Sequence, residues 1–152
     1  IEHSRNDWDF HMAPNLRAPV VLAQHFARAL PDGEAGLIVN LVDMRVRKLN
    51  PLFFSYTLSK AALWTATQTL AQALAPNIRV NAIAPGPTLA NVHQTAQEFA
   101  AEKAATLTGE GSNPDEICKA LHYLINADSV TGQMIASDGG QHLMWQTPDV
   151  MP

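Results

Sequence analysis

Three short apolar runs, each separated from the next by a helical pattern, constrain the fold of this chain more than any other feature. The runs are LIVNLV at 37–42, IRVNAIA at 78–84 and GQMIAS at 132–137. A strand buried on both faces shows such a nearly continuous apolar sequence, and strands joined by helical crossovers pair in parallel. The order therefore predicts an α/β fold with a parallel sheet.

The helical patterns lie before and between these strands. Apolar residues recur at near-helical spacing from Trp8 to Leu30, a stretch with two prolines inside it, and residues 55–75 are rich in Ala, Leu and Gln. Asn113 begins the sequence Asn-Pro-Asp-Glu, which offers an N-cap, a proline at the first helical position and a glutamate at the third. We expect residues 88–112, which are polar and Ala-rich, to form a mobile loop that carries a short helix.

The bulk composition excludes several classes of protein. Net charge is −4 with scattered basic residues, which argues against nucleic acid, and no apolar run is long enough to cross a membrane. Without a secretory signal pattern at its start, the chain reads as soluble and cytoplasmic. Its one cysteine, Cys118, permits no intramolecular disulfide and is expected to be a core thiol, and the six histidines lack metal-ligand spacing, so no metal site is indicated.

Polar and turn residues converge at one edge of the predicted sheet. Asp43 ends the first strand, Tyr56 and Lys60 open the helix that follows, and a Pro-Gly-Pro turn at 85–87 ends the next strand. In open parallel sheets ligands bind outside the carboxyl ends of the strands. Residues four apart share a helical face, so Tyr56 and Lys60 form either a catalytic pair or an ordinary helical pair, and this convergence favours catalysis.

Five segments in order resemble the short-chain dehydrogenase/reductase family. They are NLRAP at 15–19, IVNLVD at 38–43, YTLSKAAL at 56–63, IRVNAIAPGP at 78–87 and VTGQMIASDGG at 130–140. The resemblance implies a Rossmann-like, doubly wound parallel sheet and an NAD(P)H-dependent reductase, with Tyr56, Lys60 and Asn15 as catalytic residues. The family's glycine-rich TGxxxGxG turn has no match, and three strands with both edges bare make an incomplete domain. We therefore expect residues 1–152 to be the C-terminal, catalytic half of one domain whose N-terminal, cofactor-binding half lies elsewhere.

The same resemblance implies the ligands and the assembly. It favours NADP over NAD, although the segment that decides between them lies outside this sequence, and it implies a homotetramer. Surplus apolar residues on the 55–75 helix, namely Leu58, Leu63, Trp64, Leu70 and Leu74, fit contact between subunits. The residues implied in cofactor binding are Lys60, Tyr56, Pro85, Gly86 and Thr88.

Two positions carry a chemical argument of their own. Pro19 has no N–H, so the carbonyl of Asn15 lacks its usual helical donor and is free to hold a water; alternatively, Pro19 only kinks a packed helix. The family usually has a serine 13 residues before the tyrosine, where this chain has Asp43. An ionised carboxyl opposes ionisation of the Tyr56 phenol, whereas the ammonium of Lys60 favours it.

The substitution of aspartate for that serine resembles the pteridine reductases and the bacterial dihydromonapterin reductases. It implies a pterin substrate, which Asp43 helps to protonate and whose amino-pyrimidine edge suits a carboxyl partner. The residues implied in substrate binding are Asp43, Met44, Arg45 and Pro87. Two alternatives stay open: a carbonyl or 3-oxoacyl-thioester reductase of the same fold, and a non-catalytic half-domain.

Overall fold

The structure confirms the parallel sheet. It is a computed structural model that describes residues 3–92, 94–147 and 149–150, so His93 lies outside the described residues. The strands β1, β2 and β3 pair in parallel in that order, with β2 in the centre. Their bounds are Gly36–Leu41, Ile78–Pro85 and Met134–Ser137.

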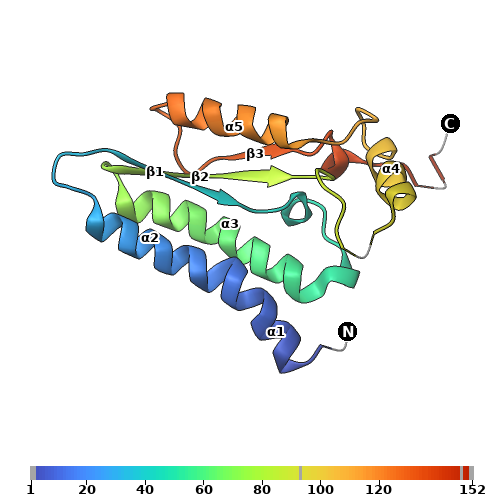
Figure 1. Cartoon of the computed structure of the whole chain (residues 1–152), viewed down its shortest axis with the longest axis horizontal. Coiled ribbons are helices and arrows are strands. Elements are labelled where there is room, and N and C mark those ends of the chain that lie inside the picture. The colour runs from blue at the N-terminus through green and yellow to red at the C-terminus, as the bar shows by residue number, and fades with distance from the viewer. Residues whose placement is uncertain (1–2, 93, 148, 151–152) are drawn as a thin grey trace.

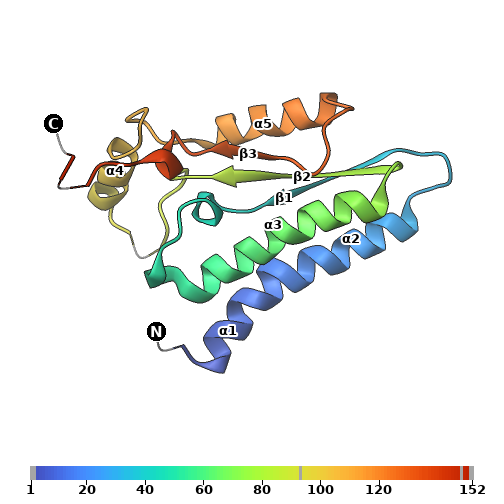
Figure 2. The same ribbon diagram turned by 180° about the vertical axis from the view of Figure 1, so that it is seen from behind.

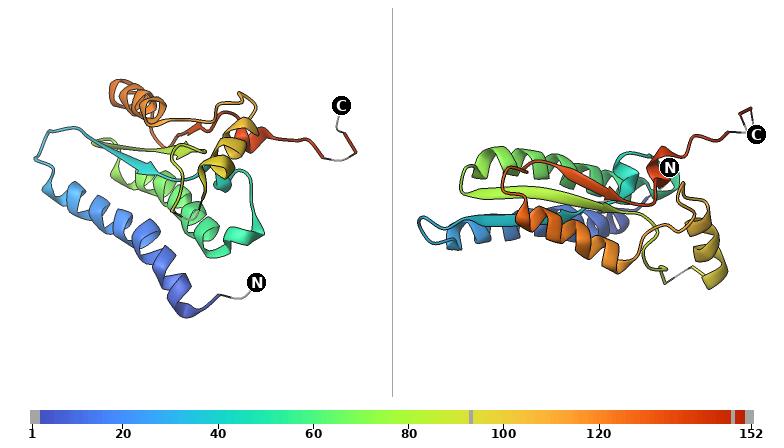
Figure 3. Two further views of the ribbon diagram at one scale, coloured as in Figure 1. Left: turned by 45° about the vertical axis from the view of Figure 1, so that its right-hand side comes forward. Right: turned by 90° about the horizontal axis from the view of Figure 1, so that it is seen from above.

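Helices cover both faces of this sheet, as a doubly wound fold requires. Figure 1 shows α2 and α3 on one face and α5 on the other, and the view from behind in Figure 2 shows the same three layers. The shorter helix α4 lies beyond the carboxyl ends of the strands, which the two views of Figure 3 also show. The bounds are Arg5–Met12 for α1, Ala18–Ala29 for α2, Phe54–Leu74 for α3, Ala96–Ala104 for α4 and Pro114–Asn126 for α5.

The central strand β2 forms the core of the molecule. Val80, Ala82 and Ala84 of this strand are completely buried, and apolar side chains of α3 pack against them. The polar side chain of Asn81 is also buried, and it bonds to the backbone at both Val130 and Gln133. A buried amide with such partners ties the segment before β3 to the centre of the sheet.

Local capping explains where the helices begin. The side chain of Asn113 accepts a hydrogen bond from the backbone N–H of Glu116, which confirms the predicted start of α5. Thr95 and Glu98 form a reciprocal capping box at the start of α4, the short helix expected within 88–112. Each cap satisfies backbone donors that the first helical turn leaves unpaired.

The predicted helix from Trp8 to Leu30 is interrupted. A π-helical turn over Ala13–Arg17 separates α1 from α2; Pro14 lies inside this turn, and Pro19 is the second residue of α2. Proline supplies no N–H, so each removes one bond from the regular helical ladder. The bend places α1 at an angle to α2 (Figure 1).

One expectation about a buried side chain needs correction. Cys118 is exposed, because the half-buried Ile117 and the buried Leu124 define the inner face of α5 and Cys118 lies about 100° round the helix from Ile117. On α3, Leu63 is buried and Leu58 is 38 % exposed, whereas Trp64, Leu70 and Leu74 pack against the sheet cores and stay partly exposed. Contact of this helix with a partner subunit stays a prediction.

The described residues contain no helix that is both long and apolar enough to cross a membrane.

The predicted turn after β3 is present: Gly139 and Gly140 have φ of 61° and 77°, a region that glycine adopts without strain. The buried carboxylate of Asp138 accepts hydrogen bonds from the backbone N–H groups of Gly140 and His142.

Candidate active site

The structure brings the predicted residues to the carboxyl ends of β1 and β2. Asp43 caps a 3-10 turn, Met44–Val46, directly after β1, and Tyr56 and Lys60 lie in the first two turns of α3. The end of β2 and its Pro-Gly-Pro turn are next to β1 in the sheet. The convergence expected from the strand order is therefore present in three dimensions.

Asp43 and Tyr56 are joined directly. The Tyr56 hydroxyl donates a hydrogen bond to Oδ2 of Asp43 over 2.8 Å. The other oxygen, Oδ1, accepts from the backbone N–H of Arg45 at 2.8 Å and lies 3.5 Å from the Arg45 guanidinium. Asp43 thus acts as an acceptor in each contact that the structure gives it.

This environment keeps the phenol protonated. Burial raises the pKa of Tyr56 well above its ordinary value, and the negative charge of Asp43 and the hydrogen bond to it raise the pKa further. The positive charge of Arg45 opposes these effects only in part. The pKa shift is opposite to the one that a lysine one turn away suggested from the sequence.

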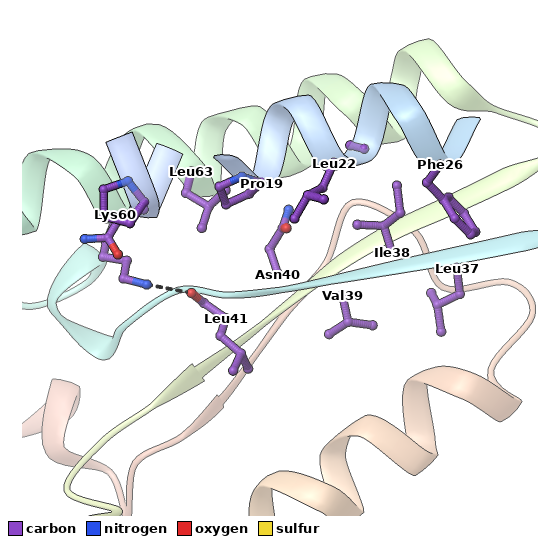
Figure 4. Close-up of a pocket in the computed structure, with 13 residues that line it drawn as sticks. Pro19, Leu22, Phe26, Leu37, Ile38, Val39, Asn40, Leu41, Lys60 and Leu63 are labelled. Carbon is purple, nitrogen blue, oxygen red and sulfur yellow. Dashed lines mark hydrogen bonds between the residues drawn. The ribbon is translucent and has the colours of Figure 1, made fainter. Parts of the chain in front are cut away.

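Lys60 is bonded to the backbone at the end of β1. Its ammonium donates to the backbone carbonyl of Leu41 over 2.9 Å, as Figure 4 shows, and lies 5.9 Å from the centroid of the Tyr56 ring. Burial lowers the pKa of Lys60, and the charge of Asp43 opposes this effect. The ammonium is therefore placed at the outer edge of β1 (Figure 4).

Asn15 reaches the site through its side chain. Its amide Nδ2 donates to Oγ of Ser59 over 3.1 Å, and that hydroxyl in turn donates to the carbonyl of Tyr56 over 2.7 Å. These bonds fix the π-helical turn to the first turns of α3. π-Helical turns occur often at functional sites, and this one places Asn15 next to the first turns of α3.

The candidate site residues line two different cavities. The larger, of about 910 Å³, is lined by Tyr56, Asp43 and Arg45, by the Pro-Gly-Pro turn and by residues of the 88–112 segment. The smaller, of about 380 Å³, lies along β1 and α2, and Lys60 lines it (Figure 4). Asn15 lines it as well.

Two residues implied from the sequence lie outside both linings. Met44 is buried, with 5 % of its surface exposed, so its position does not support the predicted contact with substrate. Thr88 donates to the carbonyl of Gly86. Gly86 itself is required by packing, because a Cβ at this position would lie 2.6 Å from the Cβ of Asp138.

The large cavity also contains residues that sequence reasoning missed. His11 and Ser55 line it beside Tyr56, and Gln94, Glu102 and Gln141 line it on the side of α4. The carboxylate of Glu102 accepts hydrogen bonds from both glutamine amides, at 2.8 and 3.1 Å. Only the spacing of four residues between His11 and Asn15 hinted that His11 shares a helical face with the site. No cluster of potential metal ligands occurs in the described ranges.

Comparison with known proteins places this chain in a family. A family model described as enoyl-(acyl carrier protein) reductase matches residues 1–142. The chain is 38 % identical over 138 residues to Protein FixR of Bradyrhizobium diazoefficiens, and this match covers 88 % of this chain and 48 % of that protein. It is 36 % identical over 136 residues to a dihydromonapterin reductase of Citrobacter koseri, which covers 87 % of this chain and 56 % of that protein.

A solved structure matches more closely. The crystal structure of FolM Alternative dihydrofolate reductase 1 from Brucella suis in complex with NADP superposes with a TM-score of 0.95 and 51 % identity, over 99 % of this chain and 61 % of that chain. This chain spans about half the length of the curated relatives that it matches. Its sequence and its fold agree with these relatives, and the chain belongs to the short-chain dehydrogenase/reductase family.

Proposed function

We propose that the protein containing this chain is an NADPH-dependent reductase of pterins. The observation that carries the proposal is the hydrogen bond from Tyr56 to Asp43. A carboxylate accepts hydrogen bonds but cannot donate one, so Tyr56 directs its proton at Asp43. When Tyr56 turns that proton to a substrate, Asp43 needs another donor. A pterin offers ring nitrogens that accept a proton and an amino-pyrimidine edge that donates, whereas a simple ketone only accepts.

The residues of this chain suit defined roles. Tyr56 is the proton donor, because its raised pKa keeps it protonated at neutral pH. The ammonium of Lys60, bonded here to the carbonyl of Leu41 at the edge of β1, would hold the ribose of the cofactor. The Pro-Gly-Pro turn at 85–87 would flank the nicotinamide, which supplies the hydride. NADPH is favoured because related structures contain NADP.

The unpaired edge of β1 supports the proposal that an N-terminal half of the same protein completes the sheet. β1 is an edge strand, and the neighbouring side chains of Leu22, Phe26 and Leu41 are exposed next to the smaller cavity. An unpaired strand edge beside exposed apolar residues is the surface that further strands of the same sheet would cover. In our proposal the N-terminal half of the same protein covers it, and the whole assembles as a homotetramer.

Two alternatives predict different activities. The description of the matching family model favours an acyl-thioester reductase, and a carbonyl reductase has the same fold. Neither substrate class supplies the donor that Asp43 requires once Tyr56 has turned away. A non-catalytic half-domain predicts no hydride transfer by the intact protein with any substrate.

The test is reduction by the intact protein, followed through the oxidation of NADPH. We expect 7,8-dihydropterins to be reduced faster than a panel of ketones and acyl thioesters. Tyr56→Phe should lower turnover by a factor of about 100 with little effect on NADPH binding, because only the proton donor is lost. Tyr123→Phe, at an exposed position on α5, is the matched control and should behave as the parent. Faster reduction of ketones or thioesters, or a Tyr56→Phe variant within a few-fold of the parent, would contradict the proposal.

A further inference from the structure

An imidazole lines the large cavity beside Tyr56 and has no part in the proton transfer described above. His11 lies in the last turn of α1 and is half-buried. Its ring packs edge-on against the Tyr56 ring, with centroids 5.7 Å apart and an interplanar angle of 72°. Its Nδ1 lies 2.8 Å from Oγ of Ser55. His11 is therefore fixed next to the proton donor by two contacts.

The burial of Ser55 decides which ring nitrogen of His11 carries the hydrogen. Ser55 is 7 % exposed, and His11 is the hydrogen-bond partner of its hydroxyl in the part of the chain that the structure describes. A buried hydroxyl hydrogen without an acceptor is unfavourable, so the Ser55 hydroxyl donates to Nδ1. A neutral imidazole that accepts at Nδ1 carries its hydrogen on Nε2. This leaves Nε2–H as a donor without a partner among the described residues.

The other strong donor on this side of the cavity has partners already. The guanidinium of Arg45 lies 3.5 Å from Asp43 and 4.3 Å from the centroid of the Phe53 ring. Lys60 lines the other cavity. The Nε2–H of His11 is thus an uncharged donor in the large cavity, and its ring lies 5.7 Å from the ring of Tyr56 between centroids. This donor is free to contact a substrate.

We propose that His11 is a substrate-binding residue whose Nε2–H donates a hydrogen bond to an uncharged oxygen next to the bond that is reduced. The inference rests on the proposed function. In a 7,8-dihydropterin, the C=N bond that remains in the pyrazine ring has the ring carbonyl oxygen on one side and the first tail hydroxyl on the other. If Tyr56 protonates the nitrogen of that bond, a donor beside the phenol ring meets one of these two oxygens.

Two amide substitutions separate this role from a structural one. The side-chain N–H of glutamine reaches the position of Nε2, whereas that of asparagine reaches the position of Nδ1. We expect His11→Phe to raise KM for the dihydropterin roughly three- to tenfold, the value of one neutral hydrogen bond, with a smaller change in kcat. His11→Gln should restore KM and His11→Asn should not.

The experiment uses the intact protein with NADPH and two substrates, a dihydropterin with a hydroxylated tail and 6-methyl-7,8-dihydropterin. A higher KM of His11→Phe with both substrates assigns the ring carbonyl as the acceptor, and a higher KM with the hydroxylated substrate alone assigns the tail hydroxyl; either result supports the inference. An unchanged KM with both, or rescue by asparagine and not by glutamine, overturns it. If His11→Phe does not fold, the two amide variants decide alone. A parent protein that reduces no dihydropterin refutes the proposed function itself, and a parent that does so while the His11 variants match it refutes only this inference.

Discussion

Replacing Asp43 with asparagine tests the electrostatic coupling on which the proposed function depends. Asparagine keeps the shape of the side chain, and its oxygen can still accept from the backbone N–H of Arg45. Its amide then faces the Tyr56 hydroxyl and donates to it, which reverses the present hydrogen bond. Of the three causes that raise the pKa of Tyr56, burial remains, and the charge of Asp43 and the bond to it are removed.

The size of the effect follows from the hydrogen bond. A hydrogen bond to a charged group is worth about 1.5–3 kcal/mol, and one pKa unit corresponds to about 1.4 kcal/mol. We therefore expect the pKa of Tyr56 to fall by about one to two units in Asp43→Asn. Removal of the carboxylate also leaves the positive charge of Arg45 unopposed, which changes the pKa in the same direction.

The assay is a titration of phenolate absorbance in the intact protein. Subtraction of the same titration for Tyr56→Phe isolates the signal of this tyrosine. Asp9→Asn is the control for the change in net charge, because Asp9 is exposed and its partner is Arg5 on the same helix. The alkaline limit of the reduction rate should move to lower pH together with the pKa. A pKa that stays the same or rises in Asp43→Asn would show that Asp43 does not hold the Tyr56 proton.

Two further substitutions have defined outcomes. Asp43→Ser should lower pterin reduction relative to ketone reduction, because serine can accept from Tyr56 and donate to a substrate; rates that fall in proportion would argue against a substrate-specific role. Arg79→Met should lower the free energy of unfolding by about 2–3 kcal/mol in urea titrations, since the Arg79 guanidinium donates to carbonyls at the end of α5 and just after it. A loss as small as that of Arg5→Met, at an exposed position, would contradict this account.

The spacing of apolar residues predicted the sheet and most helices, because this spacing shows which face of a strand or helix is buried. The three strands and α3 begin and end within two residues of their predicted bounds. The interruption at Ala13–Arg17 could not be predicted in the same way. The prolines indicate that backbone hydrogen bonds of the helix are missing, but they do not decide between a kink and a π-helical turn. Cys118 shows the same limit, since a one-residue offset moves a side chain from one face of a helix to another.

The site residues that directly follow strand ends could be predicted from the sequence. Asp43, Tyr56 and Lys60 follow from the topology alone, because parallel strands bring their carboxyl ends together. His11 and Glu102 come from helices that contact the cavity only through tertiary packing; the spacing of four residues to Asn15 is the one local signal for His11, and no local pattern marks Glu102. The sequence also indicated a carboxyl beside the phenol, but the direction of the hydrogen bond between them depends on what else Asp43 contacts.

Burial changes the pKa values of Tyr56 and Lys60 in opposite directions, and both changes favour the neutral form of the group. It raises the pKa of the phenol and lowers that of the ammonium, so each group is shifted toward its neutral form. A reductase needs a neutral phenol that donates a proton, whereas a dehydrogenase needs a phenolate that removes one. Asp43 strengthens the preference at Tyr56, because its charge adds to the effect of burial. The carboxylate in the place of a serine therefore keeps the phenol in its protonated form and makes it a weaker acid, so in our proposal the proton leaves Tyr56 only when a substrate nitrogen replaces Asp43 as its acceptor.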